Sequence, residues 1–593
     1  MQRGKKLQIH VTVSLLFLKV MKKESLLPII PLIPIVVLIF TIVLNWVNIP
    51  YTDEWGLSIV FDRFYSHTLS LDFLFSQHNE HRMFLPRLVL ITNGLLTHWD
   101  IRIQMLLTVL LVILISGNCH TLLKKVEVLS YRSRIFLMTV INMILFSLVQ
   151  SENWLFGMQF AFYIPPLMIT TALIINSSTA NFSVKLLGSA VLSIISSLSI
   201  SFGLIAWFLS FPYSDLTKRL FFENKKISGK DILHSVFFGA AAFFIIALYF
   251  HHYEKPLHHP PLSYALVHPI EAVTYFFIWC GASLTPSPKF TFIVASLVGG
   301  AFLLMFLCTL YTVFSRLIKG DERIFSLYPW CMMGLYSVIC GIFSTFGRVG
   351  IGVEQAFSSR YIAISSYLPI SVAVIIFSLN ALNNNRDIRR LRNLLAILTV
   401  AFVILYSAGF CKALKNIATH KKDLLEGIAA LSLSSACPDN YKLEKLYFHE
   451  KDSLLNRFHA LSGFHLVSVR ELNGQRILES LSVITTVGNV RYGRIEECEL
   501  RSSSQLFVRG WVSLISGSTP VIVMLVFIDD RGVSKPFTTV LMDRKAKNGA
   551  AVFSDTIDMS DIPQGHLRIS AWVIDGKESR AFQCGGTFRI EKL

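Results

Sequence analysis

Long apolar segments recur along this chain, and they constrain its fold more than any other feature. Crossing a bilayer as a helix takes roughly 20 apolar residues, because the hydrocarbon core is about 30 Å thick and each helical residue rises about 1.5 Å. Runs of about this length predict about eleven spanning helices, near residues 26–47, 101–122, 135–150, 160–177, 186–201, 203–214, 232–250, 290–314, 325–345, 361–381 and 393–412. The pair around Ser201-Phe-Gly is short, and a re-entrant hairpin is the alternative there.

The composition agrees with a bilayer as the main solvent. Of 593 residues, 53% are hydrophobic and 16% are charged, and the mean hydropathy of +0.55 excludes an ordinary soluble protein. The formal charge of +17 would suit nucleic acid, but Lys and Arg lie in short clusters between the apolar runs instead of forming one basic face. We therefore expect membrane lipid, and no nucleic acid, around this chain.

The basic clusters orient the helices, because short loops rich in Lys and Arg stay on the cytoplasmic side. They occupy alternate loops, at Lys22-Lys23, Lys124-Lys125, Lys218-Arg219, Arg316 with Lys319, and Arg389-Arg390. Residues 1–25 are then a cytoplasmic N-terminal segment, in which residues 1–20 resemble a signal without a cleavage site and Met21 is an alternative start. Because the number of crossings is odd, everything after residue 412 is expected outside.

Beyond the last span the pattern changes twice. Residues 413–485 carry apolar residues near helical spacing and predict amphipathic helices. In residues 486–593, alternating segments at 506–512, 521–528 and 567–574 are separated by turn signals such as Asp530-Arg-Gly and Lys547-Asn-Gly. They predict a small antiparallel β-sandwich. Cys498 and Cys584 fall in its first and last strands, and either a disulfide or two buried thiols would fit. The nine cysteines show no CxxC pair and no zinc-site spacing.

The first exterior loop, residues 48–100, is too long for a plain connection. It opens with Tyr51-Thr-Asp53-Glu54-Trp55 and continues to Gln77-His78-Asn-Glu80-His81-Arg82. A carboxylate at the membrane boundary can act as a general base, because partial desolvation raises its pKa toward the working pH. Ordinary solvated boundary residues are the alternative. His78 and His81, one helical turn apart, could bind a metal ion. No third ligand is evident, however, and the alternative is that both are ordinary surface histidines.

Two further exterior turns are unusually polar. The segment from Gln150 to Gln159 contains Glu152 and Trp154, and the segment from Gly347 to Tyr361 contains Arg348 and Arg360. Arginine in an exterior loop is unexpected, because Lys and Arg favour the cytoplasmic loops. The two forked N–H groups of a guanidinium suit phosphate oxygens. The glycines nearby would let backbone amides approach an anion. The alternative is that the two arginines pair with Glu354 or with lipid headgroups.

The order of these motifs resembles that of a known family. Asp-Glu-Trp after the first helix, Gln-His-Asn-Glu-His-Arg in the same loop, Glu-Asn-Trp with a following Gln, and Gly-Arg-x-Gly with Ser-Ser-Arg-Tyr are similar to bacterial polytopic glycosyltransferases of the GT-C superfamily. The chain looks broadly like phage- or island-encoded O-antigen glucosyltransferases. The similarity covers residues 26–412, which would be the transmembrane catalytic domain. Val508-Arg-Gly-Trp511 looks like part of a β-sandwich appended in that group, similar to carbohydrate-binding modules.

The resemblance implies an enzyme of the bacterial inner membrane with a periplasmic C-terminal domain. It would move a hexose such as glucose from a polyprenyl-phosphate donor to a lipid-linked or surface glycan, such as the O-antigen of lipopolysaccharide. Asp53 matches the catalytic base, Glu54 its neighbour, and Arg348 and Arg360 the contacts to the donor phosphate. The other expected substrate contacts are Tyr51, Trp55, His78, Glu80, His81, Arg82, Glu152, Trp154, Gln159 and Tyr361. Some members need a divalent cation and many do not, so the metal stays open.

Other functions remain open on the sequence alone. A flippase or transporter for lipid-linked glycan would carry charges inside its spans and helices broken at mid-membrane depth, and few charges lie there. A polymerase or ligase of lipid-linked glycan would use the exterior arginines and need less from Asp53. A non-enzymatic anchor for the β-sandwich would leave the elaborate loops unexplained.

Overall fold

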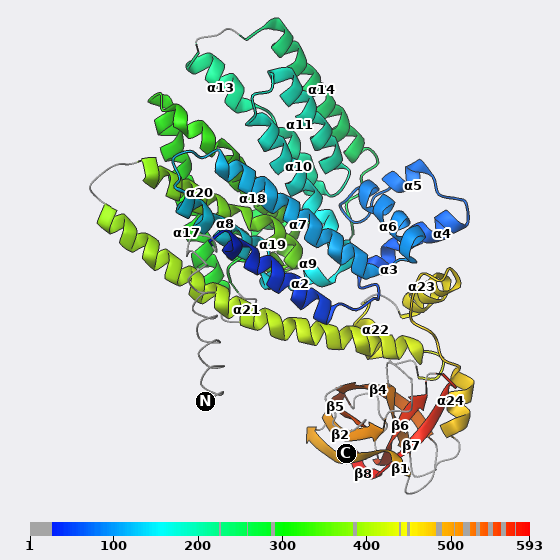
Figure 1. Ribbon diagram of the computed structural model, residues 1–593. Helices are drawn as coiled ribbons and strands as arrows, with labels where there is room; N and C mark the ends of the chain where they lie inside the picture. The colour runs from blue at the N-terminus through cyan, green and yellow to red at the C-terminus, as the bar shows by residue number, and fades with distance from the viewer. Residues whose placement is uncertain are drawn as a thin grey trace, which may run out of the picture. The chain divides into compact units, whose positions relative to one another are not determined.

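The protein is described by a computed structural model that is mostly helical and ends in a β-sheet (Figure 1). The described residues are 27–223, 227–257, 259–285, 291–382, 388–437, 440–447, 451–481, 489–502, 505–513, 522–528, 534–543, 550–558, 565–575 and 577–592. The N-terminal segment with its two alternative starts lies outside them. So do the turns predicted at Asp530-Arg-Gly and Lys547-Asn-Gly.

Among the described residues, nine helical segments are long and apolar enough to cross a membrane. They are Leu27–Asn45, Ile101–Lys124, Tyr131–Leu155, Gly157–Asn176, Gly229–Phe250, Phe292–Ile318, Glu322–Ile351, Ser359–Leu382 and Thr399–Ser432. All of them overlap spans predicted from the sequence. The chain is thus a multi-pass membrane protein.

The predicted span 203–214 is wrong. The 16-residue helix α11 (Phe182–Ser197) is followed by a 3-10 turn, η4 (Ser201–Ile205), and the four-residue α12 (Ala206–Leu209). A Cβ on Gly203 would lie 1.9 Å from the Ser196 carbonyl oxygen, so only glycine permits this tight reversal. Because α11 packs against η4 and α12, the segment fits the hairpin alternative. Leaving out the predicted pair 186–201 and 203–214 keeps the number of crossings odd. The orientation predicted for the chain in the membrane therefore stays the same prediction.

The chain divides into two compact units. The first, here the helical unit, comprises Met1–Trp46, Ser70–Val89 and Ile103–Ile417. The second, here the sheet unit, comprises Val47–Leu69, Leu90–Arg102 and Ala418–Leu593. The first exterior loop therefore contributes to both units, and its two motifs separate: Asp53-Glu54 belongs to the sheet unit and Gln77–Arg82 to the helical unit.

The helical unit is a bundle around one large apolar core. Its longer helices are α2 (Ile33–Asn45), α7 (Ile101–Lys124), α8 (Tyr131–Leu145), α10 (Phe160–Asn176), α11, α14 (Gly229–Phe250), α16 (Pro269–Gly281), α17 (Thr291–Ile318), α18 (Tyr328–Arg348), α20 (Tyr367–Leu382) and the first part of α21 (Ile388–Ser432). Its shorter elements are η1 (Leu27–Leu32), α5 (Leu71–Phe75), η2 (Leu148–Gln150), α9 (Ser151–Leu155), η3 (Gly157–Gln159), η4, α12, α13 (Tyr213–Phe221), α15 (Tyr264–Val267), η5 (Glu322–Leu327), η6 (Val349–Ile351), η7 (Val353–Phe357) and α19 (Ser359–Ser365).

Helix α16 was not predicted, because its 13 residues are too few for a span. It packs closely on α17, where glycine makes room: a Cβ on Gly299 would lie 1.8 Å from the Phe277 carbonyl oxygen. On α18, the Ser337 carbonyl accepts a hydrogen bond from Trp279 Nε1 at 3.1 Å. The connection after α14 is therefore a folded part of the bundle.

Helix α21 joins the last predicted span to the region that follows it. Its 45 residues run without a break, as Figure 1 shows, and would be about 65 Å long. The boundary predicted at 412–413 falls inside this helix. The helices predicted after it are present in the sheet unit as α22 (Asn440–Glu444), α23 (Lys451–Gly463) and α24 (Gly474–Leu481), beside α3 (Asp53–Leu57) and α4 (Ile59–Tyr65). Helix α6 (Phe84–Thr97) is shared by the two units.

The C-terminal strands form one eight-stranded sheet in the order β3-β4-β5-β2-β1-β7-β6-β8, and β3 also pairs with β6. The strands are β1 (Asn489–Ser502), β2 (Gln505–Ser513), β3 (Ile522–Ile528), β4 (Ser534–Asp543), β5 (Ala550–Asp558), β6 (Gly565–Asp575), β7 (Arg580–Gly585) and β8 (Phe588–Lys592). The segments predicted as strands correspond to β2, β3 and β6. The fully antiparallel arrangement is wrong, because β1 pairs with β7 in parallel. Two packed sheets stay a prediction.

Strand β3 is apolar at every position because both of its faces are covered. Val523 and Leu525 point into the core of the sheet with Phe553. Ile522 and Met524, on the other face, pack with helical residues that include Leu433. The apolar run at 521–528 therefore lacks the alternation seen in β2.

The disulfide considered between Cys498 and Cys584 is not formed. Their strands are neighbours, as predicted, but the register separates them: Cys584 lies opposite Asn489, whereas Cys498 pairs with Val508 farther along β1. Both are free thiols, and burial raises the pKa of Cys498 to about 11 and that of Cys584 to about 12.

We expect the nine cysteines of the chain to form no disulfide, and in the described strands the register of β1 and β7 keeps Cys498 and Cys584 apart. Protein unfolded without reductant and treated with a maleimide should gain the same number of adducts as reduced protein, measured by intact mass. A deficit of two adducts would reveal a disulfide, and a Cys498→Ser variant would show whether Cys498 takes part in it.

Candidate functional site

The segment from His78 to His81 is a tight turn. The backbone N–H of each histidine donates to the carbonyl oxygen of the other, at 2.8 and 2.9 Å. Asn79 has φ 50°, which asparagine adopts more readily than most residues. Glu80 therefore lies at the tip of the turn. The helical relation assumed between His78 and His81 is wrong.

The Glu80 carboxylate meets three basic side chains: its chain neighbour His81, and His259 and Arg348 from distant parts of the helical unit. Arg348 Nη2, at the end of α18, donates to Glu80 Oε1. Arg348 Nη1 donates to His259 Nε2 at 2.9 Å, and His81 Nε2 lies 3.6 Å from Glu80 Oε1. The four side chains are between 8% and 20% exposed. We call Glu80, His81, His259 and Arg348 the Glu80 cluster.

Hydrogen bonds fix the protonation of the two histidines in this cluster. Arginine can only donate, so His259 Nε2 accepts and a neutral His259 carries its proton on Nδ1. The Ser201 backbone N–H donates to His81 Nδ1 at 3.2 Å, which leaves the His81 proton on Nε2, toward Glu80. Glu80 Oε2 lies 3.6 Å from His259 Nε2 and has no hydrogen-bond partner among the described residues.

The electrostatics of the cluster keep Glu80 ionised. Burial by itself would raise the pKa of the Glu80 carboxyl, but the charge and the hydrogen bond of the Arg348 guanidinium, with the Nε2–H of His81 beside it, outweigh burial and hold this pKa well below its ordinary value. Glu80 is therefore a carboxylate at neutral pH, with one oxygen bonded to Arg348 and the other buried without a hydrogen-bond donor among the described residues.

Glu80→Gln is expected to destabilise the protein by about 3 kcal/mol at pH 7, because it leaves the Arg348 charge mostly buried without a counter-charge. A lowered carboxyl pKa contributes stability that is fully present above the ordinary value of 4.5 and is lost as the pH falls below it. The difference in thermal unfolding between wild type and variant should thus be large at pH 7 and shrink below about pH 4.5. An equal difference at both pH values would contradict the pairing.

Arg82 holds the turn in place. Its guanidinium donates to three backbone carbonyls: Tyr249 and Phe75, each at 3.0 Å, and His251. The first and last belong to the end of α14, where carbonyls lack partners within the helix. Tyr249 returns a hydrogen bond from its hydroxyl to the Glu80 carbonyl at 2.9 Å. Arg82, expected to contact substrate, thus has a structural role in these contacts.

A second network joins the other two polar turns. Asn153 Nδ2 lies 2.6 Å from the Ser359 carbonyl oxygen, 3.0 Å from Gln150 Oε1 and 3.1 Å from the Tyr163 hydroxyl. Tyr163 donates to the same Gln150 oxygen at 2.9 Å. The Glu-Asn-Trp turn therefore packs against the Ser-Ser-Arg-Tyr turn. Asn153 was not among the expected site residues, although its place between Glu152 and Trp154 was a signal.

Several expected contacts are buried. Trp154 is 1% exposed and donates from Nε1 to the Ser147 carbonyl at 2.9 Å, so it offers no ring face to a sugar. Gln159 and Tyr361 are 1% and 3% exposed. The Arg360 guanidinium lies 5.4 Å from the ring centre of Tyr361 and interacts electrostatically with Arg348. Glu152 is partly exposed.

The Asp53-Glu54 turn belongs to the sheet unit. Glu54 is fully buried and its Oε2 accepts from the Tyr51 backbone N–H at 2.9 Å, whereas Asp53 is partly exposed. Thr52 donates from its backbone to the Leu446 carbonyl at 2.7 Å. The two carboxylates have different surroundings, as separate roles would require. Trp55 is fully buried and cannot stack on a sugar.

Backbone strain marks the same turn. Thr52 has φ 44° and ψ −116°, which a β-branched residue rarely adopts. Such strain persists only where the surroundings enforce it, and it gathers at functional sites. Here Thr52 precedes Asp53 directly, so the strained residue sets the position of the exposed carboxylate.

The described residues offer no clear set of ligands for a divalent cation. The described residues contain no group of three His, Cys, Asp or Glu side chains able to hold a metal. In the Glu80 cluster, moreover, the Arg348 guanidinium occupies the carboxylate and would repel a second cation. Among the described residues, the metal site considered at His78 and His81 therefore lacks a third ligand.

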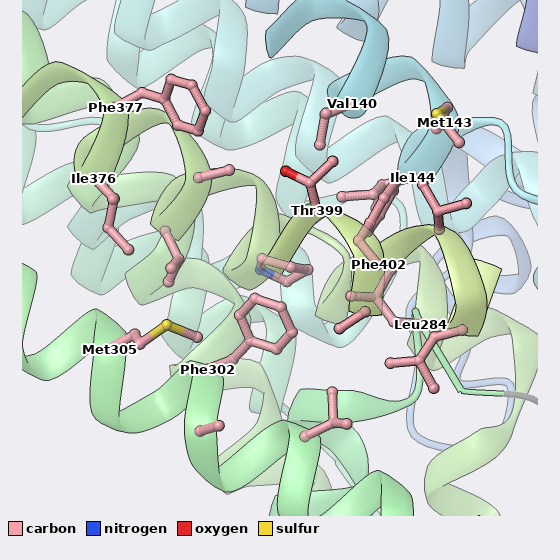
Figure 2. Close-up of a pocket in the computed structure, with 18 of the residues that line it drawn as sticks. Val140, Met143, Ile144, Leu284, Phe302, Met305, Ile376, Phe377, Thr399 and Phe402 are labelled. Carbon is pink, nitrogen blue, oxygen red and sulfur yellow. The ribbon is translucent and has the colours of Figure 1, made fainter. Parts of the chain in front are cut away.

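An apolar cavity of about 290 Å³ lies elsewhere in the helical unit. Its walls come from α8, α17, α20 and α21, and Figure 2 shows the side chains of Ile144, Phe302, Phe377 and Phe402 around it. Among the described residues, no Asp, Glu, Lys or Arg lines it. This cavity can hold hydrocarbon but not a charged group.

Comparisons of the chain with protein-family models, curated proteins and solved structures find no match. The resemblance to glycosyltransferases therefore rests on the motif residues alone.

Proposed function

We propose that this chain is a membrane-bound glycosyltransferase that moves a hexose such as glucose from polyprenyl phosphate to a glycan acceptor in the periplasm. The observation that carries the proposal is the Glu80 cluster. In it, an arginine and an ionised carboxylate, both mostly buried, meet at the end of a candidate spanning helix. The cluster unites two motifs that carry the resemblance.

Arg348 supplies the phosphate contact in this proposal. Breaking the bond between the anomeric carbon and the phosphate oxygen leaves a phosphate anion, and a guanidinium fork binds two of its oxygens. Before the donor arrives, Glu80 neutralises the buried cation, which would otherwise be costly to hold. The donor phosphate takes the place of Glu80 on Arg348, and the released carboxylate can accept a sugar hydroxyl.

The base is assigned by resemblance to Asp53. Its carboxylate would take the proton from the acceptor hydroxyl, whose oxygen attacks the anomeric carbon as the phosphate leaves. Glu54, buried and hydrogen-bonded to the Tyr51 backbone, would hold the turn that presents Asp53. This assignment is tested below by substitution.

The helical unit suits a lipid substrate better than it suits transport. The apolar cavity of Figure 2 offers space for part of an isoprenoid chain. Helices α10 and α20 carry no charged residue, and α7 carries charges only at Arg102 and Lys124 near its ends. A transporter of charged glycan lipids would be expected to place ionisable groups within such helices.

Mass spectrometry of surface polysaccharide tests the proposal in cells with and without the gene. We expect one additional hexose on the polysaccharide when the gene is present. Complementation with Arg348→Ala should fail to restore this mass. A shortened or missing polymer in the deletion would instead favour a polymerase, ligase or flippase and contradict the proposal.

A further inference from the structure

A cavity of different character lies between η1, α2, α7 and α8 in the helical unit, with a volume of about 470 Å³. Most of its wall is apolar, built from residues such as Ile35, Ile113 and Met138. Its basic residues lie where α7 ends and α8 begins: Lys124 is the last residue of α7, and Arg134 is in the first turn of α8. The cavity therefore has an apolar body and a cationic end.

The side chains that are described in the lining of this cavity include basic groups but no acidic ones. His120, Lys124 and Arg134 line it together with Tyr131, and no Asp or Glu of the described chain does. Arg134 Nη2 donates to the Val126 carbonyl at 3.2 Å. Its Nε is buried and has no hydrogen-bond partner among the described residues. A buried donor on a cation is costly to leave unsatisfied, and an anionic acceptor would satisfy it.

The cationic end lies away from the polar turns described above. Helix α8 starts at Tyr131 and has 15 residues, or a length of about 22 Å. Beyond its other end, Asn153 contacts Ser359. The basic end of the cavity thus faces the opposite leaflet, which the charge bias predicts to be cytoplasmic. That leaflet is rich in anionic lipid, which attracts basic groups.

We propose that this cavity binds one anionic phospholipid of the leaflet at the α7–α8 connection. The lipid phosphate would lie on Arg134 and Lys124, and part of an acyl chain would lie along Ile35, Ile113 and Met138. A free phosphate would leave the apolar body of the cavity unused, whereas a zwitterionic lipid would bring its own cation to the basic end. The proposal is independent of sugar transfer.

Native mass spectrometry of the purified full chain tests the headgroup contact. After exchange into detergent with equal amounts of phosphatidylglycerol and phosphatidylcholine, wild type should retain phosphatidylglycerol preferentially. Arg134→Gln should lower this retention by about tenfold, the loss expected for one charge-assisted hydrogen bond. Arg132→Gln removes the same charge two residues away, outside the lining of the cavity, and should retain the lipid. Equal loss in both variants, or no preference in wild type, would overturn the proposal.

Filling the cavity tests the acyl chain. Gly117 lines it, and a Cβ at this position meets nothing within 4 Å, so Gly117→Leu is the variant chosen to fill the space. Gly239 on α14 is equally open and lies outside the cavity, which makes Gly239→Leu the matched control. We expect lipid retention to fall in Gly117→Leu alone. Unchanged retention in Gly117→Leu would mean that no chain enters the cavity and would overturn the proposal.

Discussion

Replacing Arg348 by alanine is expected to lower sugar transfer by about 100- to 1000-fold, the loss typical of removing one preorganised donor to a developing anion. The guanidinium is 13% exposed and already directed at a carboxylate, so little reorganisation is needed when a phosphate takes that place. The measurement is kcat with a polyprenyl-phosphate hexose and purified protein in lipid vesicles.

Three variants separate this effect from a loss of folding. Arg348→Lys keeps the charge but loses the fork, and we expect it to recover only part of the rate. Arg323→Ala removes an exposed arginine, paired with Asp321, and should keep full activity. Glu80→Gln also breaks the pair between Glu80 and Arg348 and should destabilise the protein, but it keeps the Arg348 guanidinium that contacts the phosphate. If Arg348→Ala kept its rate and its dependence on donor concentration, the phosphate would lie elsewhere.

Asp53→Asn should lower transfer by about 100- to 10,000-fold, the range typical of a general base, since an amide cannot accept the proton of the acceptor hydroxyl. Membrane insertion and the unfolding temperature should stay close to wild type, because Asp53 is partly exposed and the shape of the side chain is kept. The measurement is again kcat in lipid vesicles at saturating donor.

Asp72→Asn is the matched control for this base. Asp72 is an exposed carboxylate of the same loop, in the first turn of α5, and its substitution should leave the rate unchanged. Near wild-type transfer by purified Asp53→Asn would remove Asp53 as the base. Glu80, the ionised carboxylate with an open oxygen, would then be the first candidate to replace it.

Segments whose own residue pattern is long enough to determine their secondary structure could be predicted from the sequence. Nine candidate spans follow apolar runs that only a bilayer tolerates, and β2 follows a clear alternation. The failures lie where local pattern is weak. The run at 203–214 reads as apolar, but Gly203 reverses the chain and Pro212 separates α12 from α13. Helix α16 is too short to stand out.

The candidate site was predictable in its residues but not in its pairings. Glu80, His81 and Arg348 were selected for their chemistry, yet the carboxylate and its arginine are 268 residues apart, and no local pattern links them. Glu354, only six residues from Arg348, was considered as an alternative partner, whereas the carboxylate that pairs with Arg348 is Glu80. His259 was not selected because prolines lie on both sides of it, Pro256 before and Pro260 after, and such a pattern is typical of an irregular, solvated loop. The register of β1 and β7 also separates Cys498 from Cys584, and the order of the strands alone could not predict this separation.

The most direct test of the proposed function is to follow a labelled hexose from polyprenyl phosphate in vesicles that contain the purified wild-type chain and an O-antigen acceptor. We predict that the label appears on the acceptor and that one polyprenyl phosphate is released for each sugar transferred. If the donor stayed intact, or if it crossed the bilayer without losing its sugar, the transferase account would be contradicted.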